Sequence, residues 1–549
     1  MKTRFKRKLA LLCTMAVVLS VIVGCSGCSG RGQSSTASLA ASSSKATGGS
    51  GVVESGGYVP PGAEGQKLPL EPVELKIIMR GEAPNDMDKI VAKLEEEMAD
   101  SINVKLKLVW MPNSDISNMT RLSLSAGETN DLIWHPGRTD MTNLVNSGFL
   151  LQLDDLAPIY APKFLADRPE QMIEYSKYKG GLYALPLGVY NKSGHHYNVR
   201  DDLRKQLGMD PLEDKDDVVE FAYKVKEKWP EIPPIVPGAF GQEQFTTWAT
   251  FPHLYGKRDE NFIMPTDALS GDLMLYYKNN DGKVYNLFDD PDPAIMASLA
   301  EARKLYQDGI IYQDVLSLKT YRDAMAENKA AVCMWGDIIP EPTYINRLKK
   351  VVPDGEIASV FSYDTEPGQL LATFKAWNYQ SIAKVSKHPE RCLQFLEFTQ
   401  QSQEIYDLIA YGIEGEHWTD EGPGKYLNIS ENYRWFPYLW VWNPQYDRVV
   451  ANATDKEFEM EMFLRKGDPE DFVEQWTAPL LFDPSNVSDA FAQYSALQAQ
   501  YYGPLFNGVV DTDEYMEQYR AAAYDVLKEI QNELQSQIDA LGDRSFVND

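Results

Sequence analysis

The sequence predicts an α/β protein in which helices cover mostly parallel β-sheets. Strand patterns and helix patterns alternate along the chain from residue 73 onward, which is typical of parallel strands joined by crossover helices. The composition is globular, with 44% apolar, 11% aromatic and 24% charged residues. About 480 of the 549 residues follow a low-complexity N-terminal region, which is enough chain for more than one lobe.

The N-terminus predicts a lipoprotein signal peptide. Five basic residues lie among the first eight, and an apolar run extends from Leu9 to Val23. That run is about 15 residues long, shorter than the ~20 that a permanent membrane-spanning helix needs. It ends at Ile22-Val23-Gly24-Cys25, which resembles a lipobox, so we expect lipidation of Cys25 and cleavage after Gly24. An ordinary secretory signal or a short membrane anchor is the alternative.

A low-complexity segment follows the signal. From residue 25 to 71 the chain is rich in Ser, Gly, Ala and Thr and poor in large apolar side chains. Such a segment buries too little apolar surface to offset the entropy cost of ordering. We therefore expect a signal peptide over residues 1–24 and a disordered tether over residues 25–71.

The body opens with strand and helix patterns in alternation. Residues 73–79 (VELKIIM) are rich in β-formers, and Asn85 or Asp86 can cap a helix whose apolar residues recur at helical spacing. Residues 104–111 (VKLKLVWM) alternate in the manner of a strand. The next elements are a helix at 116–124 before Gly127, a strand at 131–134, and a helix that ends at Gly148.

Later segments continue the alternation. Asp292 and Pro293 suit the first turn of a helix that closes at Gly309, with Ile295, Leu299, Ala302 and Tyr306 on one face. The segment YRDAMAENKAAVCMWGD predicts a helix leading into the strand AAVCMW. The chain ends in a long helix with one apolar face, formed by Ala523, Leu527, Ile530, Leu534 and Ile538.

The charge of the chain disfavours two classes of partner. The net charge is −27, and the predicted signal carries five basic and no acidic residues, so the mature chain stands near −32. A surface this acidic cannot release counterions from nucleic acid, and it is repelled by anionic lipid heads. We expect no nucleic-acid partner, and contact with the membrane only through the lipid anchor.

Cysteine and histidine spacing does not predict a metal site or a cofactor. Only Cys333 and Cys392 lie in the body, where we expect two separate buried thiols, with a disulfide as the alternative. Adjacent His195 and His196 would face opposite ways on a strand. The stretch DGKVYNLFDDPD lacks the ligand spacing of a calcium-binding loop, so its aspartates are interpreted as turn and cap formers.

Enzyme motifs are absent from the sequence. It contains no G-x-S-x-G elbow, no H-E-x-x-H pair and no phosphate-binding P-loop. A glycoside hydrolase needs two carboxylates across a cleft, and 80 acidic residues produce adjacent pairs such as Asp154-Asp155 by chance. We expect no enzyme activity. A surface hydrolase and a surface adhesion protein remain the rival classes.

Six segments occur in an order typical of one protein family. They are LSLSAGETNDLIW (122–134), GFLLQLDDL (148–156), KGGLYALPLG (179–188), YNVRDDLRKQLGMDPLED (197–214), YGIEGEHW (411–418) and the C-terminal stretch 507–541. Together with the lipobox, they resemble the family-1 extracellular solute-binding proteins of bacterial ABC importers, the maltose-binding-protein class. The similarity is to the LipO-type lipoprotein subgroup, which has a C-terminal extension. It covers roughly residues 73–541; Ala-Ala-Tyr replaces the usual Ala-Gly-Ile at the entry to the last helix.

The resemblance implies a two-lobed periplasmic-binding-protein-like fold (type II), with hinge segments joining two helix-covered, mostly parallel sheets. Gly181 to Gly188 fits the first crossing, although Gly180-Gly181 also fits a simple hairpin turn. We expect the lobe boundaries to divide the chain into lobe one (72–187 and 373–415) and lobe two (188–372 and 416–549, including the C-terminal helical extension).

The resemblance also implies a ligand cleft between the lobes. A sugar site pairs aromatic rings with carboxylate, amide and guanidinium groups, and open α/β sheets bind ligands at the carboxyl ends of their strands. The candidate ligand contacts follow predicted strands or crossings, and core packing is the alternative for each aromatic. They are Arg80, Glu82, Trp134, Tyr190, Trp248, Trp335, Asp337, Trp377, Asn378, Glu414 and His417.

These features together predict a function in solute capture. The resemblance implies a lipid-anchored, monomeric substrate-binding protein of an ABC importer, on the extracytoplasmic face of the cell membrane. Its ligand is expected to be an oligosaccharide, with a peptide or other small solute as the alternative. Its partner would be the pair of membrane permease subunits.

Overall fold

The computed structural model describes residues 58–192, 196–237, 247–253, 262–269, 271–318, 322–335, 342–361, 363, 365–434 and 440–548. The predicted signal peptide, Cys25 and most of the predicted tether lie outside these ranges. Within them, no helix combines the length and the apolar character that crossing a bilayer requires.

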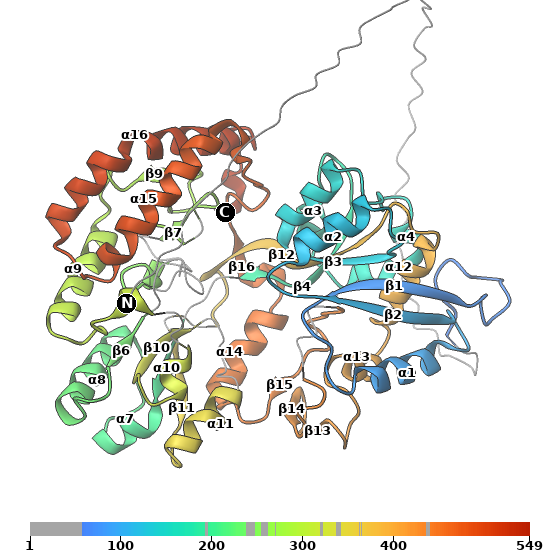
Figure 1. Ribbon diagram of the computed structural model, residues 1–549, viewed down its shortest axis with the longest axis horizontal. Helices are drawn as coiled ribbons and strands as arrows, with labels where there is room; N and C mark the ends of the chain where they lie inside the picture. Colours follow the sequence, from blue (N-terminus) through green and yellow to red (C-terminus); the bar gives the residue numbers. More distant parts are fainter. Residues whose placement is uncertain are drawn as a thin grey trace, which may run out of the picture. The chain divides into compact units, whose positions relative to one another are not determined.

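The first sheet has six strands in the order β16-β12-β3-β1-β2, with β4 pairing on β12 (Figure 1). Its strands are β1 (Val73–Arg80), β2 (Val104–Met111), β3 (Leu132–Pro136), β4 (Ala184–Lys192), β12 (Leu370–Ile382) and β16 (Phe472–Glu474). β1 pairs in parallel with β2 and β3, whereas β12 runs antiparallel to β3 and β4. Leu75, Ile77 and Ile78 of β1 are fully buried, which agrees with its predicted place inside a sheet.

Helices surround this sheet. They are α1 (Met87–Met98), α2 (Ile116–Ser125), α3 (Gly137–Asn146), α4 (Ala157–Tyr160), α5 (Pro162–Ala166), α6 (Glu170–Glu174), α12 (Pro389–Phe398) and α13 (Gln403–Ala410). The predicted α1 helix is confirmed, and its buried residues recur at helical spacing: Met87, Ile90, Leu94 and Met98.

The second sheet has four strands in the order β11-β5-β10-β6. These are β5 (His196–Arg200), β6 (Ile235–Val236), β10 (Val332–Trp335) and β11 (Ile357–Phe361); a small separate sheet contains β7 (Ile263–Pro265), β8 (Leu275–Lys278) and β9 (Tyr285–Asn286). The accompanying helices are α7 (Asp201–Leu207), α8 (Lys215–Lys228), α9 (Pro293–Gln307), α10 (Arg322–Ala326) and α11 (Pro342–Val351). Asp292 caps α9 by accepting from the Ala294 N–H, as the sequence predicted.

The strand directions are more mixed than the sequence predicted. In the second sheet, β5 runs antiparallel to both β10 and β11, and only β10 and β6 are parallel. The reason is that β4 and β12 carry the chain between two cores in opposite directions. A strand that arrives from the other core is not bound by the crossover geometry that makes neighbouring strands parallel.

Two large hydrophobic cores form around the two sheets, in agreement with two lobes, but their boundaries differ from those predicted. The first core includes Phe361 and Tyr363, so the second crossing begins before residue 370 rather than at 373. Residues 416–472, predicted for lobe two, contribute Trp418, Trp440 and Met460 to the first core. The chain leaves the first sheet for the last time after Glu474 of β16.

The segment that returns late to the first core contains β13 (Trp418–Asp420), β14 (Lys425–Asn428), β15 (Val449–Val450) and α14 (Asp455–Lys466). Thr454 and Glu457 form a capping box at the start of α14. The ring of Tyr446 in this segment lies 5.8 Å from that of Tyr406 in α13, so the position of the segment depends on long-range packing that local patterns do not reveal.

The last part of the predicted tether is packed against the body. The ring of Tyr58 lies 5.6 Å from that of Phe398, edge to face, and Ala63 is buried. The Leu70 N–H donates to the Ser101 carbonyl at 2.9 Å, and the Gln394 amide donates to the Pro61 carbonyl at 2.8 Å. The prediction of disorder up to residue 71 is therefore wrong for residues 58–71, because its few large side chains find apolar partners.

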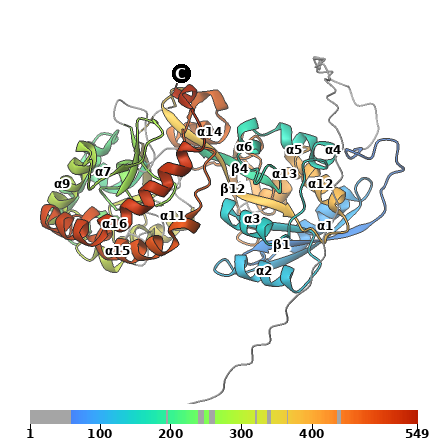
Figure 2. The same cartoon turned by 90° about the horizontal axis from the view of Figure 1, so that it is seen from above.

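The chain ends in a C-terminal module, residues 480–544, which contains α15 (Ser488–Phe506) and α16 (Thr512–Asp539) side by side (Figure 2). The predicted apolar face of the last helix is confirmed, since Ala523, Leu527, Ile530, Leu534 and Ile538 are all buried in the second core. A buried carboxylate, Asp272, accepts from the Tyr494 hydroxyl, the Gln498 amide and the Met274 N–H, each at 2.6 Å. Burial raises the pKa of Asp272 to about 6.

Neither cysteine of the body is part of a disulfide. Cys333 lies in a small cluster beside the second sheet, and Cys392 lies in the first core. Burial raises the pKa of both thiols. The expectation of two separate buried thiols is confirmed. In the stretch 281–292, Asp281 accepts from the Lys283 N–H, so its predicted role in a turn is confirmed as well.

Candidate functional site

The carboxyl edge of the first sheet brings two predicted residues together. Arg80 is the last residue of β1 and Trp134 lies in β3, and the guanidinium of Arg80 lies 5.5 Å from the centroid of the Trp134 ring. The Nε of Arg80 donates to Asn113 Oδ1 at 2.7 Å, which fixes the direction of the side chain. Parallel strands β1 and β3 end side by side, so their last residues form one edge.

Buried polar groups without partners lie at this edge. Trp134 pairs with Gln380 across β3 and β12, and the two side chains are 0% and 1% exposed. Among the residues that the structure describes, neither the indole N–H of Trp134 nor either polar atom of the Gln380 amide has a hydrogen-bond partner. Leaving such groups unpaired costs on the order of 1–3 kcal/mol each, so an external partner would be favoured there.

The crossing strands bring three more predicted residues to the same sheet. Asn378 of β12 pairs with Pro136 of β3 and with Leu187 of β4. Tyr190 lies opposite Ala376, next to Trp377. Asn378 and Gln380 are two residues apart on one strand and therefore share a face with each other. For Tyr190 and Trp377 the structure gives the backbone position alone.

Three predicted residues lie elsewhere in the first lobe. Glu82 is exposed in the loop after β1, and Glu414 is exposed in a loop held by a backbone bridge to Trp418. His417 is fully buried; its Nδ1 accepts from the Ile413 N–H at 2.9 Å, so its Nε2 donates to Asp86 at 3.2 Å. The hydrogen bond from His417 is the main cause of the lowered pKa of Asp86.

The cluster of Asp86, Glu416 and His417 has the side-chain types of a metal site but does not fit one. Lys89 pairs with Asp86 at 3.2 Å and with Glu416 at 2.6 Å, which places a cation where the metal would be. The Nε2 of His417 carries a proton toward Asp86, because its Nδ1 is already an acceptor. This cluster ties the loop at 413–417 to the start of α1.

The predicted residues of the second lobe are dispersed. Trp248 is 1% exposed; its indole donates to Glu301 at 3.0 Å and its ring packs beside Tyr197 in the second core. Trp134 is as deeply buried in the first core, but the Trp248 indole N–H is already paired with Glu301, so we do not propose Trp248 as a ligand contact. Trp335 is the last residue of β10, opposite His196 of β5, with only its backbone described. Asp337 lies outside the described residues.

Sequence reasoning missed Gln380 and Asn113. Gln380 could have been found as the neighbour of Asn378 on the same face of a strand, since side chains alternate along strands with a period of 2. Asn113 lies in the loop after β2, and its link to Arg80 depends on the pairing of β1 with β2, which local sequence does not show.

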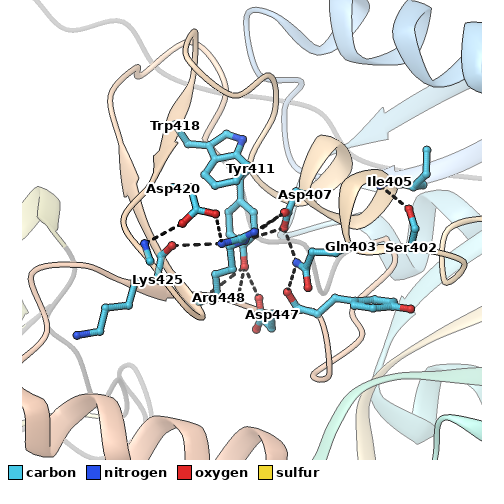
Figure 3. Close-up of polar contacts among 12 residues, drawn as sticks. Ser402, Gln403, Ile405, Asp407, Tyr411, Trp418, Asp420, Lys425, Asp447 and Arg448 are labelled. Atoms are coloured by element: carbon cyan, nitrogen blue, oxygen red, sulfur yellow. Dashed lines mark hydrogen bonds and ion pairs between the residues drawn. The ribbon is translucent and has the colours of Figure 1, made fainter.

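A second polar locus surrounds a cavity of about 430 Å³ beside β13–β15. It is lined by Gln403, Asp420, Gly422, Pro423, Gly424, Tyr446, Asp447, Arg448 and Lys466. Figure 3 shows the Arg448 guanidinium between the carboxylates of Asp407, at 2.9 Å, and Asp420, at 3.1 Å. It also lies over the Trp418 ring at 4.9 Å.

The charged groups at this second locus have hydrogen-bond or ion-pair partners within the protein. Asp447 accepts from the Tyr411 hydroxyl at 2.6 Å and the Trp442 indole at 2.9 Å, and it pairs with Arg465. The Lys466 ammonium donates to the Gln445 carbonyl at 3.0 Å. Because its donors and acceptors are used internally, this network serves to hold β13–β15 against α13, and the edge with unpaired groups is the better candidate site.

Comparison with known proteins identifies the class of this chain. Residues 84–399 match the family model of the bacterial extracellular solute-binding proteins, and residues 480–542 match a domain of unknown function. Lipoprotein LipO of Bacillus subtilis (strain 168) is 20% identical over 449 residues, which cover 76% of this chain and 82% of that protein.

Two solved structures share the fold. The N-glycan transport solute-binding protein NgtS of Streptococcus pneumoniae has a TM-score of 0.66 at 18% identity, covering 86% of this chain and 99% of that one. A human-milk-oligosaccharide (HMO) binding, ABC-transporter-associated solute-binding protein of Bifidobacterium longum infantis has a TM-score of 0.58 at 15% identity, covering 85% and 99%. These similarities confirm the predicted two-lobed α/β fold. The chain belongs to the bacterial extracellular solute-binding protein family.

Proposed function

We propose that this protein is a lipid-anchored binding protein of an ABC importer, which captures an oligosaccharide between its lobes and delivers it to membrane permease subunits. Family membership supports the role in solute capture. The lipobox-like Ile22-Val23-Gly24-Cys25 and the match to Lipoprotein LipO support the anchor. The two structural relatives described above are named for N-glycans and milk oligosaccharides, which supports a sugar ligand.

The observation that carries the proposal is the unpaired polar pair at the sheet edge. The Trp134 indole N–H and both polar atoms of the Gln380 amide are buried without a partner among the described residues, and the Arg80 guanidinium lies over the Trp134 ring. An indole N–H donates to hydroxyl oxygens, and an amide both donates to and accepts from hydroxyls. A sugar that entered this edge would satisfy groups that the protein itself leaves unpaired.

Closure follows from contacts on both lobes. A ligand shifts the equilibrium toward a closed form only by its differential affinity for that form. The first lobe would contribute Arg80, Trp134 and Gln380, and the crossing strands would contribute Tyr190, Trp377 and Asn378. Trp335 and Asp337 are our candidates from the second lobe, because the strand β10 ends there.

A glycan panel tests this function. Mature protein, in detergent, should bind one or more oligosaccharides, and its thermal midpoint should rise with the concentration of that sugar. The sugar should be recovered unchanged by mass spectrometry. Binding of peptides instead of glycans would move the proposal to the alternative solute class. Turnover that one carboxylate substitution abolishes would identify a hydrolase and overturn it.

A further inference from the structure

The last residues of the C-terminal module return to the segment that joins the two cores. After α16 the chain turns back, and Arg544 pairs with Glu474, the last residue of β16. The hydroxyl of Tyr175 also donates to Glu474, and Arg544 donates to that hydroxyl at 3.3 Å. One carboxylate therefore joins the C-terminal module, the last crossing strand and the first lobe.

This junction is shielded from solvent. The side chains of Arg544 and Glu474 are 10% and 14% exposed, which is far less than for a typical surface ion pair. Burial, with Glu474 as the next cause, raises the pKa of Tyr175 to about 12, so its hydroxyl keeps the proton that it donates. An ion pair in such surroundings is screened weakly by salt, and removal of one partner leaves a charge without compensation.

The chain that follows β16 is held from both lobes. Asn280, near the second core, donates to the Glu474 carbonyl at 3.0 Å and accepts from the Trp476 N–H at 2.6 Å. From the first lobe, Arg138 donates to the Pro479 carbonyl at 3.3 Å and to the Lys177 carbonyl at 2.8 Å. Arg138 lies in the first turn of α3, directly after the candidate binding edge. Contacts around residues 474–479 therefore extend from that edge to the module.

The module itself is fixed to the second lobe. The buried face of α16 packs in the second core, and Arg520 of α16 pairs with Asp289 at 3.3 Å. Because one end of the module is anchored in the second lobe, the pairing of Arg544 with Glu474 and Tyr175 restrains the first lobe relative to the second.

We propose that the C-terminal module, which matches a domain without assigned function, is a brace on the interlobe hinge that sets the equilibrium between lobe arrangements. This inference rests on the proposed function, because the arrangement of the lobes decides ligand affinity in a protein that closes on its ligand. Arg544, Glu474 and Tyr175 act by holding the first lobe in place relative to the second, and none of them is proposed to contact the ligand.

Distance measurements without any ligand test the brace. Spin labels at Lys107→Cys on β2 and Lys350→Cys on α11, in a Cys28→Ser background, report the separation of the lobes by pulsed electron resonance. Both positions are exposed, and Cys333 and Cys392 are buried. Arg544→Gln and Glu474→Gln should each shift or broaden the distance distribution, and the double variant should add little more, since both remove the same pair.

Arg520→Gln is the matched control. It removes an arginine–aspartate pair within the second lobe, so the distance distribution should stay as in the wild type. Tyr175→Phe keeps the ring and removes the hydroxyl, and it should give a smaller shift than Arg544→Gln. It remains informative should a charge variant fail to fold.

A second measurement, made with ligand, tests the effect of the brace on affinity. With a bound oligosaccharide from the glycan panel, the Kd of Arg544→Gln should differ from that of the wild type by about 3- to 10-fold, with no change for Arg520→Gln. Unchanged distance distributions in Arg544→Gln, Glu474→Gln and Tyr175→Phe would overturn the brace. The distance measurement needs no sugar. If the protein turns out not to bind oligosaccharides, the distance distributions still test the brace, so the two proposals can fail independently.

Discussion

Two regions of this molecule bury polar groups but pair them differently. One is the carboxyl edge of the first sheet, and the other is the contact between the second core and the C-terminal module. At the module, Asp272 accepts three hydrogen bonds, from Tyr494, Gln498 and the Met274 backbone. At the sheet edge, the Trp134 indole N–H and the Gln380 amide find no partner within the described part of the chain. A satisfied network stabilises one structure, whereas an unsatisfied one favours an incoming partner. The first arrangement is therefore structural, and the second is the site that we propose for the ligand.

The largest expected effect concerns the satisfied network. At pH 5, Asp272→Ala should lower the free energy of unfolding by about 4 kcal/mol, because it leaves buried donors unpaired and opens a cavity. Urea unfolding measures this loss. In buffer without urea, where the variant is still folded and its module docked, ligand affinity should stay within about 2-fold of the wild type, since Asp272 contacts the C-terminal module and not the sheet edge. A loss below about 1 kcal/mol would contradict a structural role for the network.

The same carboxylate should make stability depend on pH. The pKa of Asp272 is about 6 in the folded protein and 3.8 in the ordinary carboxyl, so the folded state binds the proton more tightly. Its contribution is therefore fully present below pH 4 and is lost as the pH rises toward 6, by about 3 kcal/mol. Asp272→Asn should remove this slope between pH 4 and 7 in denaturant titrations. If the free energy of unfolding of the variant depends on pH as steeply as that of the wild type, other titratable groups cause the dependence.

Local patterns explain which parts of this molecule are predictable. The α9 helix follows from Asp292, Pro293 and a face of apolar residues, all within one short segment. The buried face of α16 is equally local. By contrast, β12 pairs with β16 about 100 residues later, and the return of residues 416–472 to the first core depends on packing with α13. No periodicity encodes such partners.

In the candidate site, too, some residues are predictable from local sequence and others depend on long-range pairing. Placement at the carboxyl end of a predicted strand was enough to find Arg80 and Trp134, which the structure brings within 5.5 Å. Gln380 was missed because its importance comes from register: it lies opposite Trp134 only through the antiparallel pairing of β12 with β3. The burial of Trp248 was equally hidden, since its partner Glu301 is 53 positions away.

Gln380→Leu should weaken oligosaccharide binding by about 10-fold, or about 1.4 kcal/mol, because leucine fills a similar volume without hydrogen-bonding groups. Isothermal titration with a sugar from the glycan panel measures the change. Gln394→Leu is the matched control: Gln394 is also buried beside the first core, but its amide already donates to Pro61. Equal affinities in the wild type and Gln380→Leu would remove Gln380 from the site.

The smallest expected effect is a change in the free energy of unfolding that has opposite signs at an unpaired and at a paired buried amide. Without ligand, Gln380→Leu should raise the free energy of unfolding by about 0.5–1 kcal/mol, since it replaces buried polar atoms that lack partners with apolar ones. Gln394→Leu should lower that free energy by about 1 kcal/mol, because the Pro61 carbonyl then loses its donor at 2.8 Å. Urea unfolding of both variants in one buffer provides the comparison. A loss of stability in Gln380→Leu would mean that its amide is satisfied within the folded protein, for example by ordered water. The unpaired edge would then be structural in the same sense as the Asp272 network, and the argument that it awaits a sugar would fail.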